Sequence, residues 1–329
     1  MKKFRFTPLI YTIILILTSC TENFYNFSGV TWGTTYNITY RSDVRLDDSI
    51  STAMRAIDNS LSMFNPKSTV ARINSGTDMY ADSLVADIMR LSAMVNKCSG
   101  GAFDPTVGPL VEIWGFGTGE QRDEPVLADI ASARARVGFD KCRMENGMIH
   151  FACDGMRLDF SAIAKGYGVD QVAGMLERNG CTDYMVEIGG EINARGTNPN
   201  GKPWRIQIDA PVPDSDGNAM HTRLMVIELR DAALATSGNY RNYRRTDKGT
   251  HIVHTISPLT GYPVKTATLS VSVIAGSCAL ADALATAAMA MPYPDARSMI
   301  DKLPDAEALF VLADSTGSFK VMATDGFPE

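Results

Sequence analysis

The 329-residue sequence lacks the short motifs that mark several large enzyme classes. It contains no G-x-x-x-x-G-K-S/T phosphate loop, no H-E-x-x-H zinc motif and no G-x-S-x-G nucleophile motif. The phrase Gly115-Phe-Gly117-Thr-Gly119 has no third glycine at dinucleotide-binding spacing, and a helix-rich segment precedes it rather than a strand. These absences exclude P-loop NTPases and HExxH metalloproteases, and they argue against a dinucleotide-binding fold.

Cysteine and histidine are also too few and too scattered for common metal sites. None of the five cysteines beyond Cys20 forms a C-x-x-C pair, which excludes a zinc ribbon and a thioredoxin-like motif. The four histidines include no helical pair at metal-ligand spacing. Because five is an odd number, at least one cysteine is free or pairs between chains, and the sequence selects no disulfide. The five are Cys98, Cys142, Cys153, Cys181 and Cys278.

An excess of positive charge is missing as well. Lys and Arg number 31 against 37 Asp and Glu, for a formal net charge of −6. Residues 1–19 carry three of the positive charges and no negative one, so the rest of the chain has a formal charge of −9. Nucleic-acid binding requires a basic face, and we therefore expect no nucleic-acid partner.

The first twenty residues resemble an export signal. Basic residues precede an apolar run over 6–17, which is shorter than the roughly 20 residues that span a bilayer. The run ends in Leu17-Thr18-Ser19-Cys20, which is similar to a lipobox. We expect residues 1–19 to be a signal peptide, Cys20 to be lipidated and residues 20–28 to be a tether. The mature chain would then be exported and lipid-anchored to a bacterial membrane, facing the periplasm. The alternative is an ordinary secretory signal with an incidental cysteine.

Hydrophobic periodicity beyond residue 28 predicts an α+β fold with antiparallel sheets and packed helices in a single domain over 29–329. Residues 194–203 and 212–221 are rich in Asn, Gly, Pro and Asp, which is typical of long surface loops. The expected strands are 29–40, 183–187, 204–208, 223–229, 268–274, 307–312 and 319–324. The expected helices are 46–62, 82–99, 164–179, 278–291 and 295–302.

Asp282 and Thr286 share one face of the helix expected over 278–291, because residues four apart are stacked a turn apart. The rest of that stretch is apolar, and an unpaired carboxylate there would be costly to bury. A magnesium ion, which takes oxygen ligands, is one possible partner. An ion pair with a lysine, or a loop cap, explains the same pair without a metal.

Lys165 lies in the first turn of another expected helix, in the phrase Asp159-Phe-Ser-Ala162-Ile-Ala-Lys165-Gly-Tyr-Gly-Val-Asp170. A cation is badly placed at the positive end of a helix dipole, so a nearby anion would account for it. A solvated lysine is the alternative.

Taken together, these phrases resemble the ApbE family, the FAD:protein FMN transferases. The resemblance covers nearly the whole mature chain, and the phrases occur in family order, which makes them specific as a set. They are 32–36 (Trp-Gly-Thr-Thr-Tyr), 61–68 (Leu-Ser-Met-Phe-Asn-Pro-Lys-Ser), 72–74 (Arg-Ile-Asn), 101–110 (Gly-Ala-Phe-Asp-Pro-Thr-Val-Gly-Pro-Leu), 114–117 (Trp-Gly-Phe-Gly), 159–170, 187–191 (Glu-Ile-Gly-Gly-Glu), 235–241 (Ala-Thr-Ser-Gly-Asn-Tyr-Arg), 254–261 (His-Thr-Ile-Ser-Pro-Leu-Thr-Gly) and 281–286 (Ala-Asp-Ala-Leu-Ala-Thr).

The resemblance implies a T-fold-like domain and a set of site residues. The side chains of Asp282 and Thr286 and the backbone carbonyl of Ala162 would hold magnesium against the pyrophosphate of FAD, with Lys165 facing the phosphates or ribose. The residues implied to contact FAD elsewhere are Trp32, Phe64, Ala102, Phe103, Asp104, Asp159 and Ile256.

The sequence departs from the family pattern at two of these positions and at Ser257. Trp32 replaces a usual Met, and Phe64 replaces what is often Tyr, so any role that needs a hydroxyl there is lost. Ser257 stands where Asp or Asn is common.

The implied reaction cleaves FAD and attaches FMN through a phosphoester to a Ser or Thr of another flavoprotein, with release of AMP. We expect the acceptor to carry an Asp-x-x-Ser/Thr-Gly-Ala-Thr-like motif. His254 is the candidate general base and Asp282 the other candidate catalytic residue; Asp282 or Asp104 could take the proton instead. The alternatives are a magnesium-dependent FAD pyrophosphatase, which gives FMN and AMP, and a non-catalytic flavin-binding lipoprotein.

Overall fold

The computed structural model describes residues 23–119, 124–211, 222–239, 243–245, 251–315 and 318–328. Its centre is an eight-stranded sheet in the order β1-β2-β5-β6-β9-β12-β13-β14. All neighbouring strands of this sheet are antiparallel. The α+β class expected from the sequence is confirmed. The strands are β1 Asn23–Thr31, β2 Thr34–Ser42, β5 Tyr184–Ile188, β6 Glu191–Arg195, β9 Ala232–Gly238, β12 Thr268–Ala275, β13 Ala306–Ala313 and β14 Phe319–Ala323.

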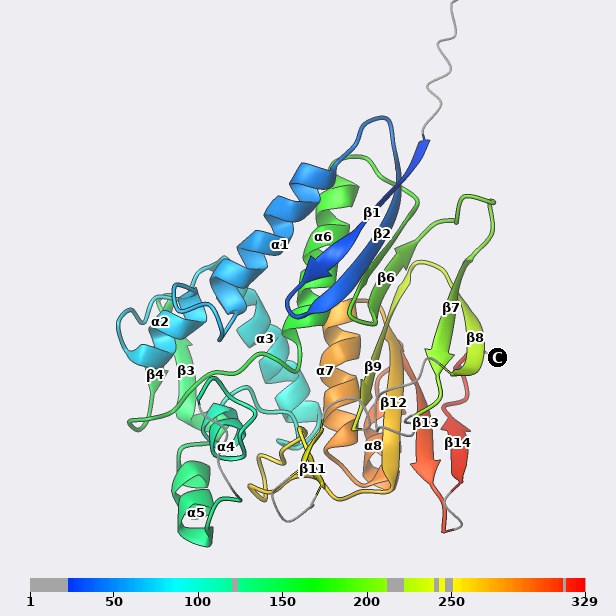
Figure 1. Ribbon diagram of the computed structural model, residues 1–329. Helices are drawn as coiled ribbons and strands as arrows, with labels where there is room; N and C mark the ends of the chain where they lie inside the picture. The colour runs from blue at the N-terminus through cyan, green and yellow to red at the C-terminus, as the bar shows by residue number, and fades with distance from the viewer. Residues whose placement is uncertain are drawn as a thin grey trace, which may run out of the picture.

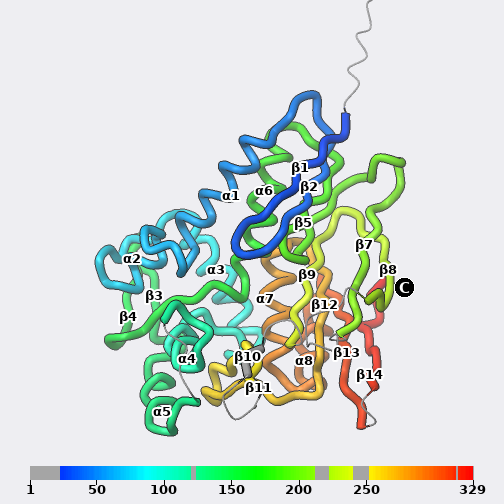
Figure 2. Tube along the Cα trace, viewed as in Figure 1, coloured from blue at the N-terminus to red at the C-terminus, as the bar shows by residue number. Residues whose placement is uncertain are grey.

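Helices cover one face of this sheet, with α6 beside α1 at one end and α7 against the middle strands (Figure 1). The hairpin β1–β2 and the hairpin β13–β14 lie at opposite ends of the sheet (Figure 2). The helices are α1 Asp47–Leu61, α2 Thr69–Ser75, α3 Ser83–Cys98, α4 Gly108–Ile113, α5 Leu127–Ala135, α6 Ala164–Arg178, α7 Cys278–Met289 and α8 Tyr293–Ile300, with a short 3-10 turn at Phe139–Lys141.

A two-stranded sheet of β7 (Trp204–Asp209) and β8 (Arg223–Leu229) covers part of the other face. Strand β9 shows the layering, because successive side chains of a strand point to opposite faces. Ala235 packs in the main cluster with α7, whereas Leu234 packs in a separate cluster with residues of β7 and β8. The middle of the molecule therefore has three layers. Two further small sheets pair β3 (Cys142–Glu145) with β4 (Met148–Phe151), and β10 (Tyr243–Arg245) with β11 (His251–Val253).

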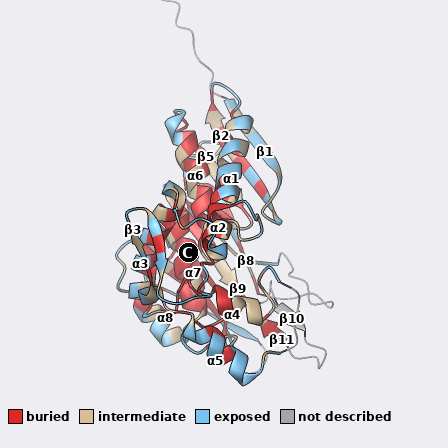
Figure 3. Ribbon diagram, turned by 90° about the vertical axis from the view of Figure 1, so that its left-hand side faces the viewer, coloured by how far each residue is buried: buried red, intermediate tan, exposed pale blue. Residues whose placement is uncertain are grey.

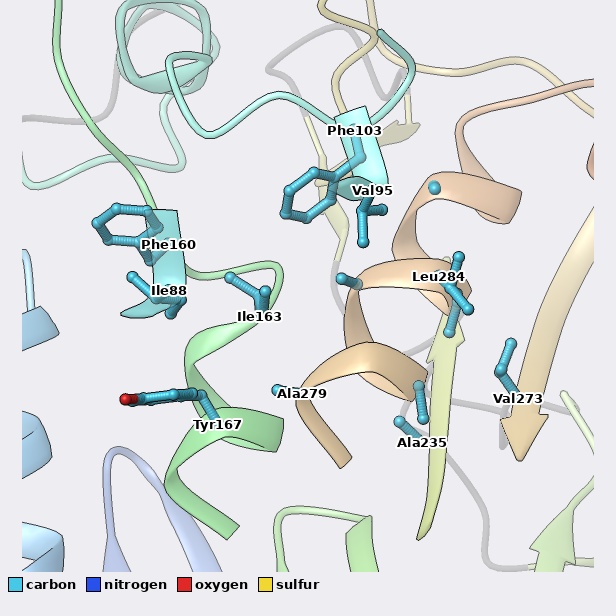
Figure 4. Packing of buried hydrophobic residues seen from close by; sticks show 14 of the residues in the cluster. Ile88, Val95, Phe103, Phe160, Ile163, Tyr167, Ala235, Val273, Ala279 and Leu284 are labelled. Atoms are coloured by element: carbon cyan, nitrogen blue, oxygen red, sulfur yellow. The ribbon is translucent and has the colours of Figure 1, made fainter. Parts of the chain in front are cut away.

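The main hydrophobic cluster joins α3, α6 and α7 to β9 and β12. Figure 4 shows Val95, Tyr167, Leu284 and Val273 from four of these elements in this cluster. Buried residues gather around α7 at the centre of the molecule (Figure 3). Among the described residues, no helix combines the length and apolar character that crossing a membrane requires.

The N-terminal region differs from the expectation of a tether followed by one strand. Residues 23–28, expected to belong to the tether, form the first part of β1, and the strand expected over 29–40 is the end of one hairpin strand and the start of the next. Trp32 and Gly33 form the two-residue turn, with φ of 49° and 73°. Positive φ at both positions is the requirement of a tight hairpin turn, which a tryptophan rarely meets.

The expected loop over 194–203 overlaps the end of β6 at Arg195, and the remainder, 196–203, connects β6 to β7. The expected loop over 212–221 lies outside the described residues, as do residues 1–22 with Cys20.

Candidate active site at the junction of helices α6 and α7

Helices α6 and α7 meet near their first turns, and a glycine makes the contact possible. A Cβ at Gly166 would collide with the Cys278 carbonyl oxygen and lie 2.8 Å from Asp282 Cβ. The Gly166 N–H donates a hydrogen bond of 3.0 Å to Asp282 Oδ2. The two phrases that the sequence presents as separate, 159–170 and 281–286, are therefore in direct contact. We call this contact region the α6–α7 junction.

The Ala162 carbonyl lies just before the first turn of α6, which begins at Ala164. The Gly166 N–H, in that first turn, donates to Asp282 and not to Ala162. The next donor along the chain, the Tyr167 N–H, donates to Ile163 O at 2.9 Å. Among the described residues, no backbone N–H donates to the Ala162 oxygen. A carbonyl without a backbone partner near a helix start is available to a ligand.

Asp282 is almost completely buried, with 4% of its surface exposed. Its Oδ1 receives no hydrogen bond from any described residue, whereas Oδ2 accepts the one from Gly166. Burial raises the pKa of Asp282 above its usual 3.8, while the Lys165 ammonium and the Gly166 N–H oppose the rise. A buried carboxylate with one uncommitted oxygen is well suited to bind a cation.

Thr286 lies one turn further along α7, as its spacing predicts. Its Oγ1 is 3.1 Å from Oγ of Ser237 on β9, and either hydroxyl can be the donor. A hydroxyl has two acceptor lone pairs besides its proton, so this hydrogen bond does not prevent Thr286 from taking another ligand. Ser237 belongs to the 235–241 phrase, for which the sequence predicted no ligand-related role.

The start of α7 is anchored by Asp170 from α6. Asp170 accepts hydrogen bonds of 2.8 Å from the backbone N–H groups of both Cys278 and Ala279, and a third of 2.8 Å from Asn193 Nδ2 on β6. A carboxylate at a helix N-terminus satisfies otherwise unpaired donors. Asp170 therefore fixes α7 against α6 and holds Asp282 in place, a role that sequence reasoning missed.

Lys165 forms an ion pair with the buried Glu191 at the start of β6. Lys165 Nζ lies 2.7 Å from Glu191 Oε1; the lysine side chain is 38% exposed and the glutamate 3%. Burial would lower the pKa of Lys165, but the carboxylates of Glu191 and Asp282 outweigh it and raise the pKa. Burial raises the pKa of Glu191 to about 7 despite the ammonium. Neither a solvated lysine nor a lysine free of protein partners is observed.

Glu191 Oε2 is buried and has no hydrogen-bond partner among the described residues. Such an atom is unusual, because leaving a buried acceptor unsatisfied costs about 1–3 kcal/mol. The sequence placed Glu191 in a family-like phrase without giving it a role, since only the fold brings it to Lys165, 26 positions away.

Trp32 lies against the first part of α6. A Cβ at Gly168 would collide with its indole ring, so the glycine is what lets the ring approach the helix. Trp32 also packs against two hydrophobic clusters. Its left-handed backbone is an observed strain of the kind that is concentrated at functional sites. The structure thus places Trp32 against α6 at Gly168, three residues after Lys165, and the indole has a packing role as well.

Four of the residues expected to contact FAD are hydrogen-bonded to other residues of the chain or buried in its interior. Asp104 accepts hydrogen bonds from Thr106 N at 2.8 Å, Thr106 Oγ1 at 2.6 Å and Phe139 N at 2.9 Å. Phe103 belongs to the main hydrophobic cluster, and Ala102 is buried. Asp159 is also buried; burial raises its pKa, and its Oδ1 accepts from Ser161 N at 2.8 Å.

The remaining expected residues belong to two loops. Phe64 lies in the connection between α1 and α2 and is 70% exposed. His254 follows β11, and its ring lies edge-on to that of Phe116, with 6.5 Å between centroids. Ile256 is buried in a separate cluster with Trp114.

The donor set at the junction suits a hard cation of the magnesium type. The described residues contain no group of three or more His, Cys, Asp or Glu side chains that could hold a metal ion. What the junction offers is one carboxylate oxygen, one hydroxyl and one carbonyl. Magnesium takes oxygen ligands and usually keeps several waters or phosphate oxygens, so a sparse oxygen set fits it.

A model of the ApbE family matches residues 32–310 of the chain. The chain belongs to the ApbE family. Relatives in this family support the assignment along the whole length. The FAD:protein FMN transferase of Vibrio cholerae is 34% identical over 326 residues, covering 95% of this chain and 95% of the relative. That of Haemophilus influenzae is 34% identical over 334 residues, covering 96% and 95%. That of Escherichia coli K12 is 30% identical over 312 residues, covering 91% and 87%.

Solved structures of the ApbE family share the fold. The flavin transferase ApbE from Vibrio cholerae superimposes with a TM-score of 0.82 at 33% identity, covering 93% of this chain and 98% of that one. The apo form of the flavinyl transferase ApbE from Pseudomonas stutzeri gives a TM-score of 0.80 at 31% identity, covering 92% and 95%. The single ApbE-like domain expected from the sequence is confirmed.

Proposed function

We propose that this ApbE-family chain is an FAD:protein FMN transferase, which moves the FMN part of FAD to a hydroxyl group of another protein. Relatives that are 30–34% identical over at least 91% of the chain carry that name. The observation that carries the proposal is the α6–α7 junction. It combines three oxygen donors: one uncommitted carboxylate oxygen of the buried Asp282, the Ala162 carbonyl, to which no described backbone N–H donates, and the Thr286 hydroxyl.

Asp282, Thr286 and the Ala162 carbonyl would hold a magnesium ion in this protein. Bound there, magnesium would neutralise charge that develops on the pyrophosphate and act as a Lewis acid. The support is the chemistry of the three oxygen donors and the burial of Asp282.

The chain's own residues would bind and orient FAD around that ion. Lys165 keeps two ammonium protons besides the one directed at Glu191 Oε1, and it lies in the first turn of α6, where the helix dipole also favours an anion. The partial exposure of the Lys165 side chain leaves it within reach of a phosphate. Trp32 lies against the same part of α6 and would contact the cofactor beside the phosphates.

The transfer step breaks one bond to phosphorus and forms another. The acceptor hydroxyl oxygen attacks the phosphorus on the FMN side, the bond from that phosphorus to the bridging oxygen breaks, and AMP leaves with the bridging oxygen. The acceptor hydroxyl loses its proton, and we assign His254 as the base that takes it. Imidazole has a suitable pKa for that task at neutral pH.

The decisive experiment incubates the chain with FAD, Mg²⁺ and an acceptor domain that carries an Asp-x-x-Ser/Thr-Gly-Ala-Thr motif. We expect flavin fluorescence on the denatured acceptor, a mass increase equal to FMN, and one AMP for each acceptor modified. The control is an acceptor with Ala at the Ser/Thr position. Free FMN with an unmodified acceptor would instead identify an FAD pyrophosphatase, and no turnover would leave only flavin binding.

The role of His254 is tested by His254→Asn. We expect the transfer rate to fall by about 10²–10⁴-fold, the usual contribution of a general base, while the affinity for FAD changes little. FAD affinity is measured by fluorescence quenching and the rate by single-turnover transfer. An unchanged rate would remove His254 from the mechanism and leave Asp282 or Asp104 as the candidate.

We also propose that the chain is exported and held on the bacterial membrane, facing the periplasm, by lipid attached to Cys20. The support is the Leu17-Thr18-Ser19-Cys20 phrase after a basic and apolar leader. Cys20→Ser should shift the protein from the membrane fraction to the soluble fraction of cells, and an unchanged membrane fraction would contradict the anchor.

A further inference from the structure

Three ionisable side chains form a buried group at the α6–α7 junction. Lys165 is bonded to Glu191 at 2.7 Å, and both Lys165 and Glu191 are electrostatically coupled to Asp282. The charge of the Lys165 ammonium therefore acts on three carboxylates, those of Glu191, Asp282 and Glu187. Among the described residues, only Glu191 accepts a hydrogen bond from it.

The position of Glu191 is fixed by the strand pairing. Glu191 opens β6 and pairs with Ile188 across a two-residue turn, so its backbone has little freedom. The Lys165 ammonium, in contrast, ends a flexible four-carbon stem and can pivot between acceptors. Asp282 is the second acceptor, because the residue next to Lys165 already donates its N–H to this carboxylate.

One carboxylate oxygen of Glu191 has unusual surroundings. Glu191 Oε2 is sealed from solvent and has no hydrogen-bond partner among the described residues. A glutamate kept only for packing or hydrogen bonding would be expected to satisfy both oxygens. Because the unsatisfied oxygen is unfavourable, the presence of a glutamate at this buried position is better explained by the charge of its carboxylate.

We propose that Glu191 is a positioning residue whose charge holds the Lys165 ammonium off Asp282, so that Asp282 keeps an oxygen for the metal ion. This inference rests on the proposed metal site. Without the charge of Glu191, Lys165 is left with the carboxylates of Asp282 and Glu187, and the ammonium then competes with the cation for Asp282. When Glu191 is charged, Lys165 stays paired with it at the start of β6, and the other N–H groups of the ammonium remain available to a phosphate.

The test measures Mn²⁺ binding to the full chain without FAD, by the loss of the free Mn²⁺ signal in electron paramagnetic resonance. It is carried out at pH 8, where Glu191 is charged, because burial raises the pKa of this carboxyl to about 7. Glu191→Gln keeps the shape of the side chain and removes its charge. We expect the Mn²⁺ dissociation constant to rise about tenfold, within the usual range for coupled neighbouring groups. The double variant Lys165→Met with Glu191→Gln removes the competing ammonium, and its dissociation constant should return to within about threefold of the wild type.

Two further variants separate this role from a general effect on folding. Glu177→Gln removes the carboxylate that pairs with Arg195 near the other end of α6, and it should leave Mn²⁺ affinity unchanged. Glu191→Asp keeps the charge and should bind Mn²⁺ more tightly than Glu191→Gln. If thermal unfolding shows Glu191→Gln to be unfolded, Glu191→Ala takes its place as the variant without the charge.

The outcomes distinguish the inference from the function on which it rests. Wild-type chain that binds Mn²⁺ and transfers FMN, together with a Glu191→Gln variant of equal Mn²⁺ affinity, would overturn the role of Glu191 alone. A weakened Glu191→Gln variant that the Lys165→Met change does not rescue would also overturn it. Wild-type chain that neither binds Mn²⁺ nor transfers FMN would contradict the proposed function itself.

Discussion

The α6–α7 junction and the two loops at 62–68 and 254–262 hold their side chains in opposite ways. At the junction, Asp282 is 4% exposed and hydrogen-bonded to α6, and Asp170 fastens the start of α7. In the loops, Phe64 is 70% exposed and Leu259 is 52% exposed. Both regions carry family-like phrases, but the loops present some exposed apolar side chains beside buried ones such as Ile256.

The difference corresponds to two kinds of task. Charge stabilisation requires groups that are already oriented and shielded from water, because they then need no rearrangement during the reaction. Contact with a large ring system or a protein acceptor requires exposed apolar surface, which loops supply. We infer that the junction serves the phosphates and the loops serve the flavin or the acceptor. The predictions below test this division.

The largest effect is expected from Asp282→Asn. The amide keeps the shape of the side chain but removes its charge, so FMN transfer should fall by about a thousandfold, the scale of losing several kcal/mol of transition-state stabilisation. The melting temperature should stay within a few degrees or rise, because a buried charge is removed. Single-turnover transfer and calorimetry measure both quantities. Asp295→Asn, at an exposed position on α8, is the control, and a loss of less than tenfold at Asp282 would contradict the proposed division.

The next effect comes from the helix contact. Gly166→Ala places a methyl group against the Cys278 carbonyl and 2.8 Å from Asp282 Cβ, which are not flexible ends. We expect a loss of about 2–3 kcal/mol in the free energy of unfolding, typical of overpacking, and a large loss of transfer. Urea denaturation measures the stability.

Gly174→Ala on the same helix is the matched control for Gly166→Ala. Its methyl group would meet only the Arg178 guanidinium at 3.3 Å, which can move. It should therefore stabilise the protein by about 0.5–1 kcal/mol. Equal effects at the two glycines would show that the α6–α7 contact is not unusually tight.

A smaller effect is expected from pH. Burial raises the pKa of Glu191 from 4.5 to about 7 and also raises that of Asp282, so the folded state retains protons that the unfolded state releases. The stability from these carboxyls is full below about pH 4.5 and declines as pH rises through 7. Unfolding in EDTA from pH 5 to 8 should show this decline, and Glu191→Gln should reduce it. A slope that Glu191→Gln leaves unchanged would assign the decline to other groups.

The smallest effect on stability is expected from Phe64→Ala in the loop. Because the ring is mostly exposed, the free energy of unfolding should change by less than about 0.5 kcal/mol. The KM for FAD or for the acceptor should rise several-fold while Mn²⁺ affinity is unchanged. Loss of Mn²⁺ binding in this variant would break the division between the two regions.

The longer helices were predicted well because their apolar residues recur at helical spacing, whereas the shorter α2, α4 and α5 were not expected. The expected helices 46–62, 82–99 and 164–179 correspond to α1, α3 and α6 within one or two residues at each end. Strand β9 was missed, since Ala-Ala-Leu-Ala-Thr-Ser-Gly has little strand propensity; it forms because β6 and β12 flank it and α7 covers it. The hairpin turn at Trp32 and Gly33 was missed because a tryptophan rarely adopts positive φ.

The sequence by itself determined the α+β class, the main helices, and the placement of Asp282 and Thr286 on one helical face, because these follow from local periodicity. Only the tertiary structure decided that Asp282 meets Gly166, that Lys165 pairs with Glu191, and that Asp170 anchors α7. These contacts join residues 26 to 116 positions apart. No local pattern encodes such pairings, because they depend on how closely α6, α7 and the start of β6 pack together. The close approach of α6 to α7 is possible because Gly166 has no side chain.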